Sequence, residues 1–137
     1  MKMLLYPLLS LAFCGWVACQ STSEPDQSTS SDGPPVINRL IPAAELRDLL
    51  TQNSEVQLID VRTAKEVSGG HISGAVNYDF YSGDFRQQLQ QLDPTKTTVV
   101  YCKSGGRSGR TRQILKKMGF REVYDLEGGY RTWSAQQ

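Results

Sequence analysis

From residue 36 onward, short apolar runs alternate with amphipathic segments along the chain. Two runs, 57–61 and 97–101, place apolar and β-branched residues at consecutive positions. Continuous runs of this kind are typical of strands covered on both faces, as in parallel sheets. Weaker strand patterns occupy residues 75–78, 122–126 and 36–40. The pattern therefore predicts up to five short strands.

Amphipathic segments separate these predicted strands. Pro42 opens a segment whose apolar residues share one helix face, and residues 63–66 have the spacing of a capping box. Further helical patterns run over 85–92 and over 111–118, the second followed by Gly119 as a stop signal. Strands alternating with helices predict an α/β fold with a central, mostly parallel sheet flanked by helices.

The first 35 residues have a different composition from the rest. Lys2 precedes an uncharged, largely apolar run over 3–18, which is short for a bilayer span of about 20 residues. A basic start, an apolar stretch and a small residue at its end predict a signal peptide over residues 1–18. Residues 20–35 contain no hydrophobic residue, so we expect 19–35 to be a disordered tether and 36–137 to be one folded domain.

The end of the predicted signal peptide resembles the processing site of a bacterial lipoprotein precursor. Val17 and Ala18 precede Cys19, with Trp16 where such precursors usually carry a leucine-like residue. The resemblance implies that Cys19 is lipidated and that the protein is exported and anchored to a membrane facing the periplasm. The alternative is simple cleavage, which would give a soluble periplasmic or secreted protein.

Charge and cysteine content narrow the classes of function. A formal net charge of +1 argues against a binder of bulk polyanions, and one histidine excludes catalytic zinc sites built from several histidines. Three cysteines leave at least one unpaired. Because Cys14 lies in the predicted signal peptide and Cys19 begins the predicted tether, Cys102 is the thiol of the folded domain.

Cys102 ends the strongest strand pattern and begins a loop rich in glycine and positive charge. The carboxyl end of a strand facing a helix N-terminus is the usual ligand site of α/β sheets. Paired glycines allow backbone N–H groups to converge, and two cations favour a thiolate. These surroundings lower a cysteine pKa and predict a nucleophile, whereas a buried structural cysteine is the alternative. The loop residues after Cys102 are Lys103, Ser104, Gly105, Gly106, Arg107 and Ser108.

This loop resembles the active-site loop of single-domain rhodaneses, a sulfurtransferase family. Three other segments resemble rhodanese motifs in the same order: LIDVR at 58–62, GHISGAVN at 70–77 after Glu66, and LEGGY at 126–130 followed by Trp133. Ser73 stands where the family commonly has proline. The resemblance covers essentially all of the predicted domain and implies a rhodanese-like fold.

The resemblance also implies a reaction. The thiolate of Cys102 would take sulfane sulfur from a small anionic donor such as thiosulfate and pass it, as a persulfide, to a thiol or cyanide acceptor. Backbone N–H groups of residues 103–108 would hold the sulfur, and Lys103 and Arg107 would steer the donor. No metal or other cofactor is expected, and we expect a monomer.

Other functions stay open at this stage. A non-catalytic rhodanese-like binding module is one alternative, and a persulfide carrier or thiol-redox protein is another. A phosphatase of the same fold is disfavoured because four residues, rather than five, separate Cys102 from Arg107. Seven cations lie between residues 102 and 121, but Phe120 is the only aromatic residue among them, so nucleic-acid binding is not expected.

Several other residues have a structural and a functional interpretation. We expect His71 to fix a turn through hydrogen bonds rather than act as a base, and Asp60 with Arg62 to form an organising ion pair. Tyr130 and Trp133 are expected in the core, and residues 79–81 at the rim of the pocket.

Overall fold

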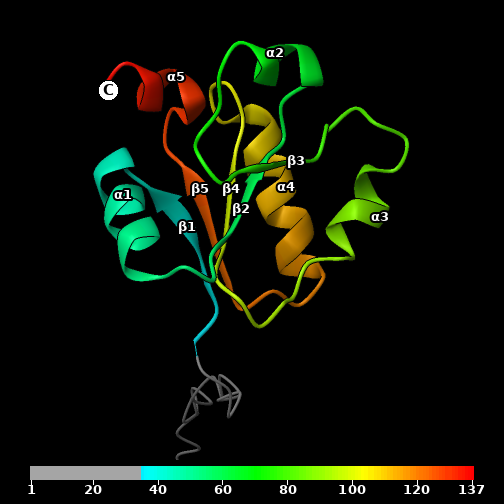
Figure 1. Ribbon diagram of the computed structural model, residues 1–137. Coiled ribbons are helices and arrows are strands. Elements are labelled where there is room, and N and C mark those ends of the chain that lie inside the picture. Colours follow the sequence, from blue (N-terminus) through cyan, green and yellow to red (C-terminus); the bar gives the residue numbers. More distant parts are fainter. Residues whose placement is uncertain (1–34) are drawn as a thin grey trace, which may run out of the picture. The chain divides into compact units, whose positions relative to one another are not determined.

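The computed structural model describes residues 35–137, which form a single five-stranded sheet flanked by helices (Figure 1). All neighbouring strands are parallel, in the order β1-β5-β4-β2-β3. The predicted parallel α/β fold is therefore confirmed, and all five predicted strands are present. The strands are β1 (Ile37–Ile41), β2 (Gln57–Asp60), β3 (Val76–Asn77), β4 (Thr98–Tyr101) and β5 (Glu122–Leu126).

Five helices connect the strands or follow the last one. They are α1 (Ala43–Gln52), α2 (Ala64–Ser68), α3 (Phe85–Leu89), α4 (Gly106–Lys117) and α5 (Gly129–Ser134). The helix after β4 was expected to follow the cysteine loop, but α4 already begins at Gly106. Because Gly105 takes a left-handed conformation with φ 107°, the chain turns into the helix within the loop itself.

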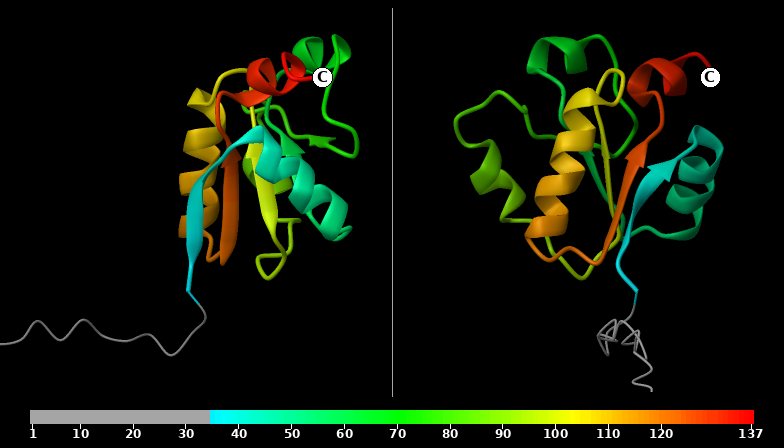
Figure 2. Two further views of the ribbon diagram at one scale, coloured as in Figure 1. Left: turned by 90° about the vertical axis from the view of Figure 1, so that its left-hand side faces the viewer. Right: turned by 180° about the vertical axis from the view of Figure 1, so that it is seen from behind.

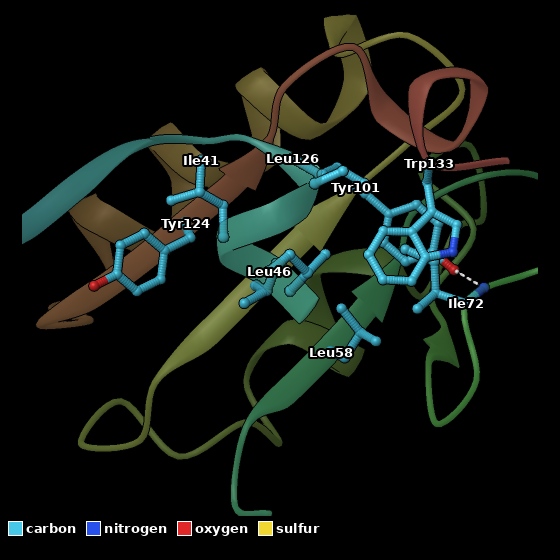
Figure 3. Close-up of a cluster of buried hydrophobic side chains, with 10 residues drawn as sticks. Ile41, Leu46, Leu58, Ile72, Tyr101, Tyr124, Leu126 and Trp133 are labelled. Atoms are coloured by element: carbon cyan, nitrogen blue, oxygen red, sulfur yellow. Dashed lines mark hydrogen bonds between the residues drawn. The ribbon is translucent and has the colours of Figure 1, made fainter. Parts of the chain in front are cut away.

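The helices form a layer on each face of the sheet (Figures 1 and 2). Strand side chains alternate between the faces, so Tyr101 packs in one hydrophobic cluster while its neighbour Cys102 packs in the other. The cluster of α1 and α5 includes Leu46 and Trp133, as Figure 3 shows, which confirms that Trp133 is a core residue. In the same cluster the buried Tyr101 hydroxyl accepts a hydrogen bond from the backbone N–H of Ile72 at 3.1 Å.

Two predicted helix signals are confirmed. Thr63 Oγ1 accepts a hydrogen bond from the Glu66 backbone N–H, and the Thr63 backbone N–H donates to the Glu66 carboxylate, which completes the capping box. Gly119 follows α4 with φ 87°, the left-handed conformation of a helix stop. The helical pattern predicted over residues 85–92 is only partly right, because α3 ends at Leu89 and leaves Leu92 outside the helix.

The predicted signal peptide, the lipidation residue Cys19 and most of the tether lie outside the described residues and stay predictions. Within residues 35–137, no helix is long and apolar enough to cross a membrane.

Candidate active site

Cys102 lies directly after β4, at the carboxyl edge of the sheet, and only 1% of its surface is exposed. The loop that follows brings the predicted residues around its sulfur. The Gly105 N–H donates to Sγ at 3.1 Å, and the Ser108 hydroxyl lies 3.4 Å from the same atom. Lys103 and Ser104 are exposed beside this buried centre.

The hydrogen bonds around Cys102 decide its ionisation. Burial by itself raises the pKa of the thiol, because a charged sulfur loses its water. The side chain and backbone of Ser108 and the backbone N–H groups of Ser104 and Gly105 have the opposite effect, and together they lower the pKa below its ordinary value. The site therefore favours a thiolate without a histidine base.

The first turn of α5 holds the cysteine loop in place. The Tyr130 N–H donates to the Cys102 carbonyl at 2.8 Å, and the Arg131 N–H donates to the Lys103 carbonyl at 3.1 Å. This approach requires Gly129, whose φ is 62° and whose absent Cβ would lie 2.5 Å from the Cys102 carbonyl oxygen. The glycine at 129 thus fixes the backbone on which the nucleophile sits.

Arg107 is held by a carboxylate instead of projecting freely toward solvent. Its guanidinium donates two 2.7 Å hydrogen bonds to Glu66, one to each carboxylate oxygen. The Tyr81 ring lies 5.7 Å from the same guanidinium, and the expected place of residues 79–81 at the rim stays a prediction. The ion pair with Glu66 anchors the first turn of α4 to α2, so the free positive charge expected of Arg107 is partly neutralised.

Glu66 should consequently contribute to stability near neutral pH. The hydrogen bonds from Arg107 lower the pKa of this carboxyl to about 2, so its contribution is lost as the pH falls from about 4.5 toward 2. We expect Glu66→Gln to reduce the free energy of unfolding by about 2 kcal/mol at pH 7, allowing for partial exposure, and by much less at pH 3. Urea denaturation at both pH values measures this. Glu127→Gln, at an exposed position, is the control, and equal losses in the two variants would contradict the expectation.

A second ion pair, which unlike the first is fully buried, supports the site from the opposite sheet face. Arg62 donates to the Asp60 carboxylate, with a closest distance of 2.6 Å, and to the Gly70 carbonyl at 2.8 Å. The guanidinium also lies 4.0 Å from the centre of the Tyr130 ring. Asp60 and Arg62 thus organise the neighbouring loops, as the sequence predicts, and Tyr130 is half-buried against the core.

The expectation for His71 is wrong. Its side chain is exposed and makes no hydrogen bond with any residue in the part of the chain that the structure describes. The turn is instead held by backbone groups, such as the Ala75 N–H donating to the Ile72 carbonyl and the bond from Ile72 N–H to Tyr101.

Lys103 lies at a shallow cationic pocket of about 350 Å³ beside the cysteine loop. Arg62 and Arg131 add positive charge to its lining, and Glu66 adds the one negative charge. A small anion is the ligand that this balance of charge favours. Among residues 35–137, no three His, Cys, Asp or Glu side chains are grouped as metal ligands would be.

Asp125 is a buried carboxyl that the sequence pattern does not single out. It projects from β5 to the sheet face that carries Cys102, because its neighbours Tyr124 and Leu126 pack on the other face. Asp125 Oδ1 has no hydrogen-bond partner among the described residues, and Oδ2 lies 3.9 Å from Arg112 Nε. Burial raises the pKa of this carboxyl to about 6, against the weaker opposing effects of Ser108 and Arg112.

Ionisation of Asp125 should therefore cost stability. Its pKa is higher in the folded protein than the ordinary 3.8, so the folded state loses stability as the pH rises from about 4 to about 6. We expect Asp125→Asn to raise the free energy of unfolding by about 2 kcal/mol at pH 8 and by little at pH 4. Thermal unfolding at both pH values tests this, with the exposed Asp48→Asn as control. A destabilised Asp125→Asn protein at pH 8 would refute the expectation.

Comparison with known proteins identifies relatives of this chain. The sequence pattern of the rhodanese-like domain matches residues 42–136. The chain is 39% identical over 82 residues to the uncharacterized protein YqhL of Bacillus subtilis. It is 34% identical over 118 residues to a thiosulfate sulfurtransferase of Corynebacterium glutamicum, and 33% identical over 84 residues to the thiosulfate sulfurtransferase GlpE of Shewanella oneidensis.

The extent of these matches differs between relatives. The alignments cover 60%, 66% and 61% of this chain, and 64%, 39% and 81% of YqhL, the Corynebacterium protein and GlpE respectively. Among solved structures, a rhodanese-related protein from Thermoplasma volcanium is similar with a TM-score of 0.63 and 28% identity, over 72% of this chain and 92% of that one. Residues 42–136, which match the rhodanese-like domain, contain every residue of the candidate site.

Proposed function

Because this chain belongs to the rhodanese-like domain family, we propose that it is a sulfurtransferase that carries sulfane sulfur as a persulfide on Cys102. The observation that carries the proposal is the buried Cys102 sulfur, which accepts the Gly105 N–H at 3.1 Å and has a lowered pKa. A binding module would not need a thiolate held by converging donors. The sulfurtransferases among its relatives support the same class of reaction.

In the first step the Cys102 thiolate attacks the outer sulfur of a donor such as thiosulfate. A sulfur–sulfur bond forms on Cys102, the sulfur–sulfur bond of the donor breaks, and sulfite leaves with the electron pair. Lys103, which lines the cationic pocket, would attract the donor and stabilise sulfite. Arg107 acts mainly as a positioning residue, because Glu66 holds its guanidinium.

In the second step an acceptor removes the sulfur. Cyanide or a thiolate attacks the terminal persulfide sulfur, and the bond to Cys102 breaks with its electron pair returning to the cysteine. Thiocyanate or an acceptor persulfide is released, and the thiolate is restored. Backbone N–H groups of the cysteine loop supply the donors that would stabilise the negative persulfide.

Two measurements on the same protein test this proposal. Thiosulfate and cyanide should give thiocyanate catalytically, and thiosulfate alone should increase the protein mass by one sulfur atom. Hydrolysis of p-nitrophenyl phosphate serves as the counter-assay for a phosphatase. Phosphate release without thiocyanate, or the absence of both the mass increase and thiocyanate, would overturn the proposal.

A further inference from the structure

A groove of about 660 Å³ runs along α4, on the side of this helix that faces Arg86 of α3. We refer to it as the α4 groove. Phe80, Ile114 and Met118 give it apolar surface, and Arg86, Arg110 and Lys117 are its charged residues. Its volume lies within the range of about 300–1,000 Å³ that is usual for sites of small organic ligands.

The hollow has a clear origin in the sequence of α4. The residues of α4 that line it recur every three or four positions, so they form one face of the helix. One of them, Gly106, has no side chain to fill the space. A Cβ built on Gly106 would meet no atom within 4 Å, so this end of the groove is open.

All charged residues that line the groove are positive. Arg86, Arg110 and Lys117 form no ion pair with any residue from 35 to 137, and no acidic residue lines the groove. Two other cations of α4 are held by the protein: Arg107 by Glu66, and Arg112 by Asn38. Free cations above an apolar floor are complementary to an organic anion with an apolar body.

The groove also ends next to the reacting sulfur. Gly106 lines its end and directly follows Gly105, whose N–H donates to Cys102 Sγ. Phe80, at the same groove, packs against the hydrophobic cluster that contains Cys102. The cationic pocket of Lys103 is lined by none of the groove residues, so the two are separate places beside one loop.

We propose that the α4 groove binds the sulfur acceptor and that this acceptor is a small organic anion with an apolar body and a terminal thiol. The proposal rests on the sulfurtransferase function proposed above and names its acceptor class. The thiol loses its proton to solvent, and the thiolate attacks the terminal persulfide sulfur past Gly106. The bond to Cys102 breaks, its electron pair returns to Cys102, and the acceptor departs as a persulfide.

Three acceptors that differ in one property each can test the ligand class. Mercaptooctanoate is anionic and long, mercaptooctanol is long but neutral, and mercaptopropionate is anionic but short. With thiosulfate as donor, we expect the KM of mercaptooctanoate to be about tenfold below that of either other thiol. Equal KM values for the three thiols would overturn the proposal while thiocyanate formation left the sulfurtransferase function intact.

A matched pair of double variants locates the site. Arg110→Gln with Lys117→Gln removes two groove cations, and Lys116→Gln with Arg121→Gln removes two exposed cations that do not line the groove. Only the first should raise the KM of mercaptooctanoate, by about tenfold, while the KM of thiosulfate with cyanide stays unchanged. An equal rise in both double variants would show an effect of bulk charge and overturn the proposal.

A binding measurement separates the groove from the chemistry. Anilinonaphthalene sulfonate, a fluorescent apolar anion, should bind the wild type and compete with octanoate. Its affinity should fall about tenfold in the Arg110→Gln, Lys117→Gln protein and not in the control protein. This measurement needs no sulfur transfer. If the wild type forms no thiocyanate and no persulfide, but the Arg110→Gln, Lys117→Gln protein binds the dye more weakly, the groove is a binding site and the sulfurtransferase function is refuted. Unchanged binding in both double variants would refute the groove.

Discussion

Cys102→Ser is expected to lower thiocyanate formation from thiosulfate and cyanide by at least about a thousandfold, because a serine hydroxyl is not ionised at neutral pH and forms no persulfide. The side chain is buried and the replacement is nearly the same size, so the free energy of unfolding should change little. The loop donors, including the Gly105 N–H, remain in place for the oxygen. The expected result is a folded, inactive protein.

Initial rates and protein mass after incubation with thiosulfate measure this effect. Cys19→Ser makes the same substitution at a cysteine outside the predicted domain and should retain full activity. A Cys102→Ser protein that still forms thiocyanate at a tenth of the wild-type rate or more would disprove the assignment of the nucleophile.

Gly129→Ala is expected to destabilise the protein by more than about 3 kcal/mol and to reduce sulfur transfer. The new methyl group would lie 2.5 Å from the Cys102 carbonyl oxygen and 2.7 Å from the Lys103 carbonyl carbon. Both neighbours are backbone atoms that belong to the active loop, so no flexible side chain can yield. The left-handed φ of 62° adds further strain for alanine.

Gly74→Ala provides a matched control for this prediction. Gly74 also has a left-handed conformation, with φ 81°, but nothing lies within 4 Å of its added Cβ. Its substitution should cost only about 1 kcal/mol, so the difference between the two variants measures the collision with the loop. Guanidinium denaturation gives both values. Similar losses for Gly129→Ala and Gly74→Ala would show that backbone conformation alone matters.

Local signals in the sequence were sufficient to locate most of the helices and strands and to single out Cys102 as the candidate nucleophile. The β-rich runs, the Thr63–Glu66 capping box and Gly119 each depend on residues close together in the chain, and each lies where expected. Cys102 could be recognised because its loop combines glycines and cations within a few positions.

Long-range features could not be obtained in this way. The sequence reveals Glu66 as part of a capping box. Its ion pair with Arg107 joins residues 41 positions apart and depends on how α2 packs beside α4, so local patterns could not predict it. The role of Asp125 depends on strand order, since only the packing of β5 beside β4 places this carboxyl behind the cysteine loop. The LEGGY motif could have pointed to Gly129, yet its reason for being glycine is contact with Cys102, 27 positions earlier.

The hydrogen bonds from Tyr130 and Arg131 to the cysteine loop also define how much of the C-terminal region the active protein requires. These donors belong to the first turn of α5, which follows Cys102 by more than one strand and helix, so the reactive loop is complete only after residues 129–131 have been synthesised. A chain truncated before Gly129 would retain Cys102 but lack the brace for its carbonyl. A truncated or fused version of the protein should therefore keep α5 intact as part of the active site, with any C-terminal fusion partner attached after Ser134.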